Sequence, residues 1–240
     1  MGTNNEMVRQ TMLGIYEQVL SILKTYPNVS TVLDIPAGSG LFTSILFENK
    51  YKVYAADILP EKMSFEKVKC VFADMNKRLP FEDNFFDAVV CLAGIEHVEN
   101  PMFTLSEFFR ILSPKGIFIL DIPNINSLYS RVKFLLTGGF FLFDPFWLSE
   151  HNHISVLPPY LLNSYLEKNK FQEIRIYRAS LKSYYIWLHP LITCFFSFLS
   201  RILHKKFPLL FLNYEQSIKF NNQKNVMWSD GLIFVAKKPY

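Results

Sequence analysis

The sequence predicts an α/β protein with a mostly parallel sheet covered by helices on both faces. Two observations carry this prediction. Short apolar runs alternate with helical segments of about ten residues through the first half of the chain, an order typical of parallel strands joined by crossover helices. Acidic residues or a sharp turn directly follow several of these runs, and ligands of such sheets bind at the carboxyl ends of the strands.

Hydrophobic periodicity places the elements of the first half. Residues 6–25 carry apolar side chains at helical spacing, and Pro27 and Asn28 end that helix. The expected strands are 31–35, 52–57, 69–72, 86–92 and 117–121. Further helices are expected at 41–48 and 101–112, and a turn at 113–116 leads into the fifth strand.

The second half is less regular. We expect a helix at 127–136, an apolar loop at 138–147, a helix at 158–168, a strand at 171–177 and a last strand at 231–236. Residues 178–225, between the last two strands, are expected to form an apolar and basic helical insertion. Since neither an internal repeat nor a flexible linker is visible, we expect residues 1–240 to form a single domain.

The composition excludes several classes of protein. Half of the residues are hydrophobic, including 24 Phe, which excludes a disordered chain. Cys70, Cys91 and Cys194 are far apart, which predicts a reducing compartment and no disulfide scaffold. The polar residues 1–10 do not resemble a secretory signal, so we expect a cytoplasmic protein.

The net charge of +4 is unevenly distributed. Residues 174–214 contain no acidic residue and six basic ones, so the rest of the chain is slightly acidic. That balance argues against a nucleic-acid partner, which requires a basic surface over the whole domain. A local basic patch beside apolar residues fits an anionic membrane surface or an anionic substrate better.

The turn at residues 36–40 follows a strand that ends in Asp34. Its glycines, Gly38 and Gly40, permit a close backbone approach to a ligand. The turn lacks the Gly-Lys-Ser/Thr of a P-loop and the third glycine of the dinucleotide fingerprint. Because Asp34 would repel a pyrophosphate, a ligand that carries an ammonium group is expected.

With these residues, the sequence resembles the class I S-adenosylmethionine-dependent methyltransferases, in particular a small-molecule, quinone-pathway-like branch. The first motif corresponds to residues 34–40, with Pro36 in place of a glycine. Matching segments follow at Asp57, at 72–75, at 79–87 and at 110–116. The resemblance implies a Rossmann-like sheet with an antiparallel last strand, and S-adenosyl-L-methionine as the cofactor.

The resemblance also divides the chain and assigns its residues. Residues 28–125 become the cofactor-binding half, and 126–170 the acceptor-side elements. Asp57 is expected to bind the ribose hydroxyls, Asp74 the adenine amino group, and Met75 to cover the adenine ring. The implied cofactor-binding residues are Asp34, Pro36, Ala37, Gly38, Gly40, Asp57, Ile58, Asp74, Met75, Cys91, Leu92 and Ala93.

His97 and His153 are the candidate catalytic residues. His97 lies just past the fourth strand, beside the expected methyl group, and either acts as a general base or has a structural role. His153 precedes the helix at 158–168 and has the same two alternatives. Quinone-pathway relatives bind a divalent metal through a Glu-His pair and another acid three residues earlier. Since Ala93 occupies that earlier position, no metal is predicted.

Residues 184–203 indicate an amphipathic helix. Residues 184–200 lack charged side chains, but His189 and Pro190 interrupt them, which disfavours a membrane span. The segment is expected to be either a lid or an element at the inner face of the membrane. The sequence therefore predicts methyl transfer to a small apolar or lipid-linked acceptor; the alternative is a non-catalytic methyltransferase-like module at a membrane surface.

Overall fold

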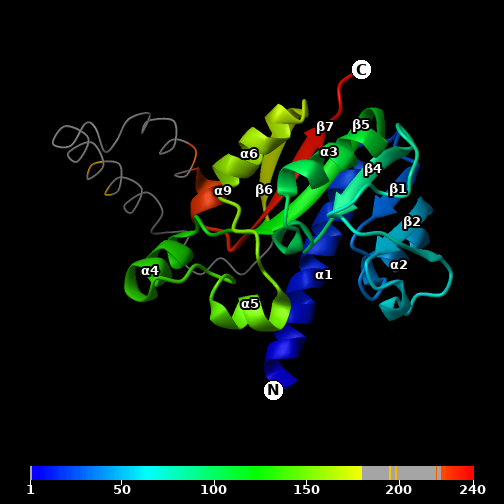
Figure 1. Cartoon of the computed structure of the whole chain (residues 1–240). Coiled ribbons are helices and arrows are strands. Elements are labelled where there is room, and N and C mark those ends of the chain that lie inside the picture. Colours follow the sequence, from blue (N-terminus) through cyan, green and yellow to red (C-terminus); the bar gives the residue numbers. More distant parts are fainter. Residues whose placement is uncertain (1, 180–194, 196–197, 199–219, 221–222) are drawn as a thin grey trace.

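The computed structural model describes residues 2–179, 195, 198, 220 and 223–240. Its strands form a seven-stranded sheet in the order β3-β2-β1-β4-β5-β7-β6 (Figure 1). Their bounds are Thr31–Asp34 for β1, Lys52–Asp57 for β2, Cys70–Phe72 for β3, Phe86–Cys91 for β4, Leu112–Pro123 for β5, Gln172–Arg178 for β6 and Gly231–Lys237 for β7.

The sheet is parallel except for β7. Strands β1 to β5 pair in parallel, whereas β7 pairs antiparallel with both β5 and β6. This confirms the mostly parallel sheet with an antiparallel last strand. Because parallel strands end at the same edge, the topology brings the carboxyl ends of β1, β2, β4 and β5 together there.

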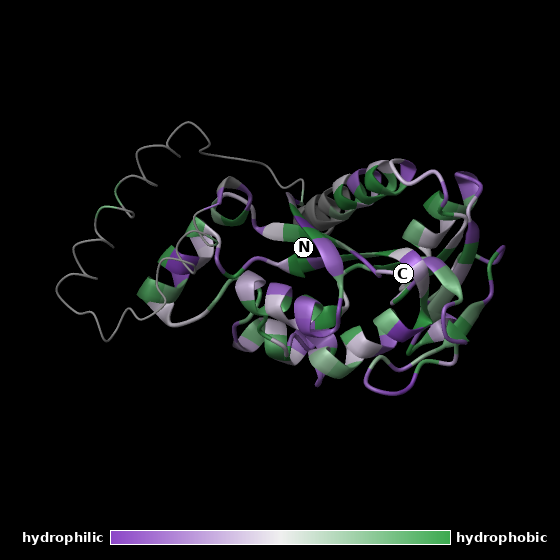
Figure 2. Cartoon of the chain, turned by 90° about the horizontal axis from the view of Figure 1, so that it is seen from above, coloured by the Kyte–Doolittle hydropathy of each residue, from purple (hydrophilic) through white to green (hydrophobic). Residues whose placement is uncertain are grey.

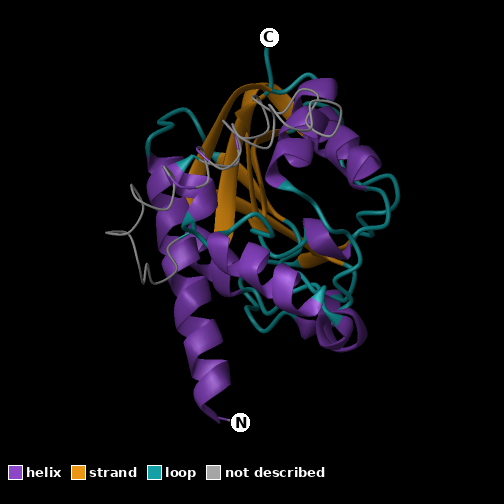
Figure 3. Ribbon diagram, turned by 90° about the vertical axis from the view of Figure 1, so that its left-hand side faces the viewer, coloured by secondary structure: helices purple, strands orange, loops and turns teal. Residues whose placement is uncertain are grey.

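Helices cover both faces, as expected (Figure 3). Helix α1 (Gly2–Lys24) and α2 (Leu41–Glu48) pack on one face, and α3 (Pro101–Ile111) and α6 (Pro159–Lys168) pack on the other. In β4, Val90 belongs to the first layer, whereas Val89 and Cys91 belong to the second. Burial on both sides explains why the sequence of β4 is continuously apolar.

Two local predictions were wrong. The turn expected at 113–116 is part of β5, where the pairing with β4 shifts register and Lys115 has a φ of +66°. The four residues form an irregularity within the strand and do not end it. The loop expected at 138–147 is also too long, because α5 (Pro145–His151) begins inside it. Asp144 caps that helix by accepting hydrogen bonds from the backbone N–H groups of Phe146 and Trp147.

The remaining elements are α4 (Leu128–Thr137), α9 (Lys224–Met227) and two 3-10 turns, η1 (Pro60–Lys62) and η2 (Ile95–His97). Helix α4 lies at one end of the molecule, away from the sheet (Figure 1), and Figure 2 colours the ribbon by residue hydropathy. Leu135 and Leu136 of this helix are exposed. Most of the predicted insertion at 178–225, with its amphipathic helix at 184–203, lies outside the described residues. Among the residues that are described, no helix has the length and apolar character needed to cross a membrane.

Candidate active site

The turn after β1 is held against the end of β2. The backbone N–H of Ala37 donates to the carbonyl of Ala56 at 2.9 Å, and that of Gly38 donates to Asp57 Oδ2 at 2.8 Å. Gly38 has a φ of +52°, and a Cβ built on it would meet no atom within 4 Å. The turn therefore presents open space beside bare backbone, where a ligand can approach closely.

Gly40 has a different reason to be glycine. Its φ is +83°, and it stands at the N-cap of α2. A Cβ there would lie 2.9 Å from Met63 Cγ and 3.0 Å from Phe65 Cβ, so its small size permits packing within the protein. The two glycines of one motif thus have separate roles, one open to the site and one in the packing behind it.

Asp57 ties the two loops together at this edge. Its second carboxylate oxygen, Oδ1, accepts from the backbone N–H of Leu59 at 2.9 Å. A carboxylate oxygen can accept more than one hydrogen bond, so both oxygens retain acceptor capacity for a pair of hydroxyls. Ile58, the next residue, is 52% exposed and offers an apolar surface beside them.

The segment after β3 contains the two predicted adenine contacts. Asp74 accepts from the backbone N–H of Asn76 at 2.9 Å and pairs with Lys77 at 3.1 Å. The side chain of Met75 is partly buried against the core, and its carbonyl accepts from Thr104 Oγ1 at 2.9 Å. These contacts order the loop, while the expected adenine-binding roles of both residues stay predictions.

Asp34 is almost completely buried, with 1% of its surface exposed. Its Oδ2 accepts from Thr43 Oγ1 of α2 at 2.6 Å. Burial raises the pKa of Asp34 to about 7, and the nearby charge of Asp57 adds to that rise. Pro36 packs against Gly94, where any Cβ would collide with the proline ring, so the turns after β1 and β4 are in contact.

The residues after β4 contain a second buried acid. Cys91 and Leu92 are buried, and the backbone N–H of Ala93, which has a φ of +48°, donates to Asp121 Oδ1 at 2.6 Å. Glu96 is 4% exposed, and its Oε2 has no hydrogen-bond partner. Burial and the neighbouring Asp121 raise the pKa of Glu96, and burial likewise raises the pKa of Asp121.

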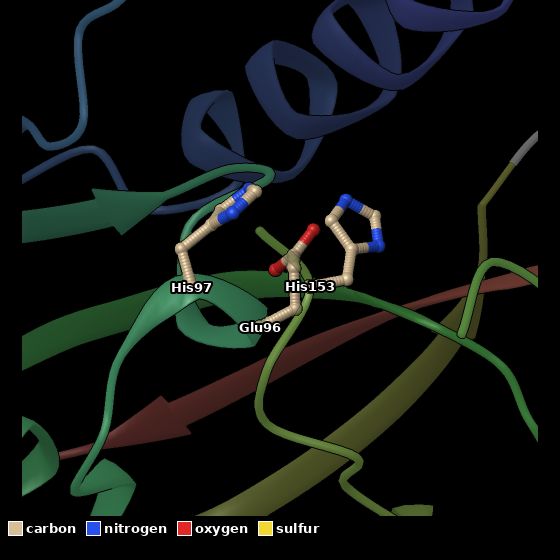
Figure 4. A group of neighbouring side chains, drawn as sticks. All are labelled: Glu96, His97 and His153. Carbon is tan, nitrogen blue, oxygen red and sulfur yellow. The ribbon is translucent and has the colours of Figure 1, made fainter. Parts of the chain in front are cut away.

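The two predicted catalytic histidines lie together although they are far apart in the sequence. The ring centroids of His97 and His153 are 4.9 Å apart, and a carboxylate oxygen of Glu96 and one nitrogen of each ring lie within 4.8 Å of one another (Figure 4). The backbone N–H groups of Ile154 and Ser155 donate to the carbonyl of Glu96, and these hydrogen bonds join the two segments that carry the cluster.

In each histidine, a contact between Nδ1 and a backbone carbonyl oxygen determines which ring nitrogen carries the proton. Nδ1 of His97 lies 3.2 Å from the carbonyl oxygen of Asn152, and Nδ1 of His153 lies 2.8 Å from that of Leu142. Since a carbonyl oxygen only accepts, Nδ1 carries the proton and Nε2 keeps its lone pair in the neutral ring. Burial lowers the pKa of His153, which favours that neutral form.

Carboxylate and imidazole are also groups that bind metal ions. The described residues bring the carboxylate of Glu96 and the two imidazoles together, whereas position 93 contributes only a methyl group. The expectation of no metal stays a prediction that metal analysis of the purified protein would test.

Sequence reasoning missed two residues of this site. Asp121 lies beside Ala93. Its position at the end of the fifth expected strand is the signal that could have identified it. Tyr16 of α1 was assigned only to an amphipathic helix, yet it lies near the acids. Burial and the charges of Asp34 and Asp121 raise the pKa of Tyr16 to about 12.

The order of the strands and the antiparallel β7 are those of the class I, S-adenosylmethionine-dependent methyltransferase fold. Residues 33–120 match the family model described as "Methyltransferase domain". The match covers the turn after β1, the ends of β2 to β4 and most of β5, where the predicted cofactor residues lie.

Known proteins with similar sequences include a methyltransferase. An uncharacterized protein of Methanocaldococcus jannaschii is 34% identical over 124 residues, which are 50% of this chain and 53% of that protein. A demethylmenaquinone methyltransferase of Clavibacter sepedonicus is 32% identical over 97 residues, which are 37% of this chain and 39% of that protein. The chain thus spans about half the length, or less, of these curated relatives.

A solved structure has a similar fold over nearly the whole length of this chain. A SAM-dependent methyltransferase from Archaeoglobus fulgidus superposes with a TM-score of 0.58 at 19% identity and covers 93% of this chain and 94% of its own. At this identity the likeness establishes the fold. The class I sheet predicted from the motifs is therefore confirmed.

S-adenosylmethionine, the cofactor of this class, suits the residues present. The open space at Gly38 admits a ligand against the backbone, and Asp57 offers acceptors for two hydroxyls. The buried acids Asp34, Glu96 and Asp121 suit a ligand that carries an ammonium and a sulfonium group. All of these residues lie at the carboxyl edge of the sheet.

Proposed function

We propose that the protein transfers the methyl group of S-adenosylmethionine to a small apolar or lipid-linked acceptor. The observation that carries the proposal is the hydrogen bond between Gly38 and Asp57, together with the buried acids Asp34 and Glu96. All four residues lie within the region matched by the methyltransferase family. Nucleic acid is not the expected partner, because the basic residues are concentrated in a single segment and not over the whole surface.

The cofactor supplies an already activated methyl group, so the protein mainly has to orient the two reactants. Asp57 and Ile58 would hold the nucleoside, with Asp74 and Met75 at its base. Pro36, Ala37 and Gly40 would shape the turn, while Asp34 and residues 91–93 would hold the methionine part. Asp34, Asp57 and Cys91 are buried, and their burial would help to exclude water from the reacting centre.

His97 and His153 are the proposed groups for removing a proton from the acceptor. Both rings keep a free Nε2 lone pair in the neutral form, and both lie beside the end of β4. A base whose pKa lies near the working pH is effective in this role. The same pair would orient an acceptor that carries a hydroxyl or amine.

Exposed apolar side chains support an apolar acceptor. On α4, Leu135 is 83% exposed and Leu136 is 76% exposed, and Phe146 and Leu148 of α5 are more than half exposed. A relative named demethylmenaquinone methyltransferase matches part of the chain, and we extend this to a quinone-like acceptor here. Contact of the basic, apolar segment 178–225 with the inner face of a membrane belongs to the same proposal.

Calorimetry with S-adenosylhomocysteine tests the cofactor part, and labelled-methyl transfer into a fractionated cell extract tests the reaction. We expect binding by the wild type and label in an apolar fraction. Binding without transfer to any fraction would favour a non-catalytic module instead. Flotation with anionic vesicles tests the membrane part separately, and a protein that stays at the bottom of the gradient contradicts it.

A further inference from the structure

Three carboxyl groups are buried at the carboxyl edge of the sheet. Asp34 ends β1, Glu96 follows β4 and Asp121 lies in β5, and these strands are adjacent in the order β1-β4-β5. Their exposed fractions are 1%, 4% and 8%. Within the part of the chain that the structure describes, none of the three forms an ion pair with a lysine or arginine.

The three acids differ in their hydrogen bonds. Asp34 accepts from Thr43 Oγ1 and Asp121 from the backbone N–H of Ala93, whereas Oε2 of Glu96 is buried without a partner. An ionised carboxyl in such a place is costly, so one of two neighbouring carboxyls retains a proton. The pKa values of Glu96 and Asp121 are accordingly raised by burial, and that of Glu96 also by the charge of Asp121.

Among the residues that the structure describes, the titratable groups around this pair supply no permanent positive charge. They are Asp34, Cys91, Tyr16, His97 and His153. Burial and then the acids Glu96, Asp121 and Asp34 raise the pKa of Cys91, so its thiol stays neutral. Burial lowers the pKa of His153, so its ring is neutral at any pH above the ordinary histidine pKa.

A bound ligand can therefore supply the positive charge that the surroundings of Glu96 and Asp121 lack. We propose, on the basis of the proposed function, that the Glu96–Asp121 pair exchanges a proton with the charge of the bound methyl donor. The pair releases its proton when the sulfonium binds and takes one up when methyl transfer leaves a neutral sulfide. Ala93, a predicted cofactor contact, links the pair to that position through its hydrogen bond to Asp121.

The atoms and charges of this exchange balance. The bond between sulfur and the methyl carbon breaks with its electron pair staying on sulfur, and the acceptor atom uses its own pair for the new bond. An acceptor that loses a proton in this step passes it to His97 or His153. From there the proton reaches the carboxylate of Glu96, one oxygen of which lies within 4.8 Å of a nitrogen of each ring. The disappearance of the sulfonium charge makes the pair more basic at the moment when the proton is released.

The comparison of S-adenosylmethionine with S-adenosylhomocysteine isolates this effect, because both carry the ammonium group and only the first carries the sulfonium. Calorimetry at about pH 7 to 8.5, above the titration range of His153, gives the affinity of each. We expect the ratio of the two affinities to rise with pH, by up to about tenfold per unit for one linked proton. Buffers of different ionisation enthalpy should show proton release on binding of the donor and less on binding of the product.

Glu96→Gln keeps the shape of the side chain and should make the affinity ratio independent of pH, as should Asp121→Asn. The matched control is Glu99→Gln in the same loop, an exposed carboxylate that should leave the slope unchanged. His153→Asn should also retain the slope above pH 7. The proton-release measurement uses the wild type alone, so it remains available if a variant does not fold.

A wild-type ratio that does not change with pH, or a Glu96→Gln protein that retains the full slope, overturns the inference. So does a stoichiometric metal ion in the purified protein that Glu96→Gln loses, because the carboxylate would then serve that metal. If neither ligand binds the wild type, the proposed function fails as well. Binding of both ligands at a constant ratio contradicts the proton exchange alone.

Discussion

The two parts of the chain predicted to bind the cofactor and the acceptor, residues 28–125 and 126–170, hold their side chains in different ways. In residues 28–125, carboxylates accept hydrogen bonds from the backbone of neighbouring loops, as Asp57 does from Gly38 and Leu59. In residues 126–170, large apolar side chains such as Leu135 and Leu136 extend into solvent. The family match covers 33–120 and ends before the second region. This difference agrees with the prediction that the first region binds the cofactor and the second the acceptor.

The largest effect is expected at Asp57. Asp57→Ala removes the acceptors for the ribose hydroxyls and releases the backbone N–H groups of Gly38 and Leu59. We expect a loss of about 2–4 kcal/mol of binding free energy, or about 30- to 1000-fold weaker binding of S-adenosylhomocysteine by calorimetry.

Asp87→Ala is the matched control for that variant. Asp87 also accepts two backbone N–H groups, those of Ser30 and Thr31, but it lies at the opposite edge of the sheet. It should lower the free energy of unfolding while leaving the dissociation constant unchanged. Equal losses of affinity in both variants would mean that Asp57 acts only on the fold.

The second effect concerns the two histidines, where the two regions meet. His153→Gln removes a proposed proton acceptor from the acceptor side, and we expect a loss of about 10²-fold in kcat with unchanged binding of S-adenosylhomocysteine. The acid limb of the wild-type rate profile should have its midpoint below the ordinary histidine pKa of about 6.5, because burial lowers the pKa of His153 and only the neutral ring accepts a proton.

The same lowered pKa affects stability with a definite sign. The unfolded chain binds a proton to His153 at a higher pH than the folded protein does, so this residue opposes folding increasingly as the pH falls through about 6.5. Urea unfolding at about pH 5 and pH 8 should show a smaller loss of stability at the acidic pH in His153→Gln than in the wild type. A larger acid loss in the variant would contradict the assignment.

A third comparison separates the two glycines of the first turn. Gly38→Ala places a methyl group in the open space of the site, so we expect about tenfold weaker cofactor binding and a stability loss of about 1 kcal/mol for its positive φ. Gly40→Ala meets Met63 and Phe65 instead and should mainly lower the thermal midpoint. Calorimetry and thermal unfolding of both variants give the two numbers, and a reversed order would contradict the assignment of these roles.

The smallest effect is expected on the surface of α4. Leu135→Asn should change the free energy of unfolding by no more than about 0.5 kcal/mol, because the side chain is already exposed. The KM for an apolar acceptor should rise a few-fold. Leu162→Asn in the buried face of α6 is the contrast, with an expected loss of more than 2 kcal/mol. An unchanged KM in Leu135→Asn would remove α4 from the acceptor site.

Most of the fold could be predicted from local sequence patterns. The buried strands β1, β2 and β4 and the helices α2, α3 and α6 agree with the structure to within one or two residues. Two errors arose where a local sequence pattern is compatible with two different structures. Pro114 and Gly116 suggested a turn but lie in an irregular part of β5, and Asp144 begins a helix inside an apparently apolar loop.

The sequence by itself determined the class I sheet of this protein, because strand ends and glycine turns are local features and parallel strands end at a common edge. It placed Asp34, Asp57 and the turn after β1 together at the carboxyl edge of that sheet before any coordinates were considered. Only the tertiary structure decided that His153 lies beside His97, 56 positions earlier, and that Glu96 is buried next to Asp121. Burial and the charge of a distant neighbour are properties of the packed chain, so the chemistry of these groups could not be predicted from their positions in the sequence.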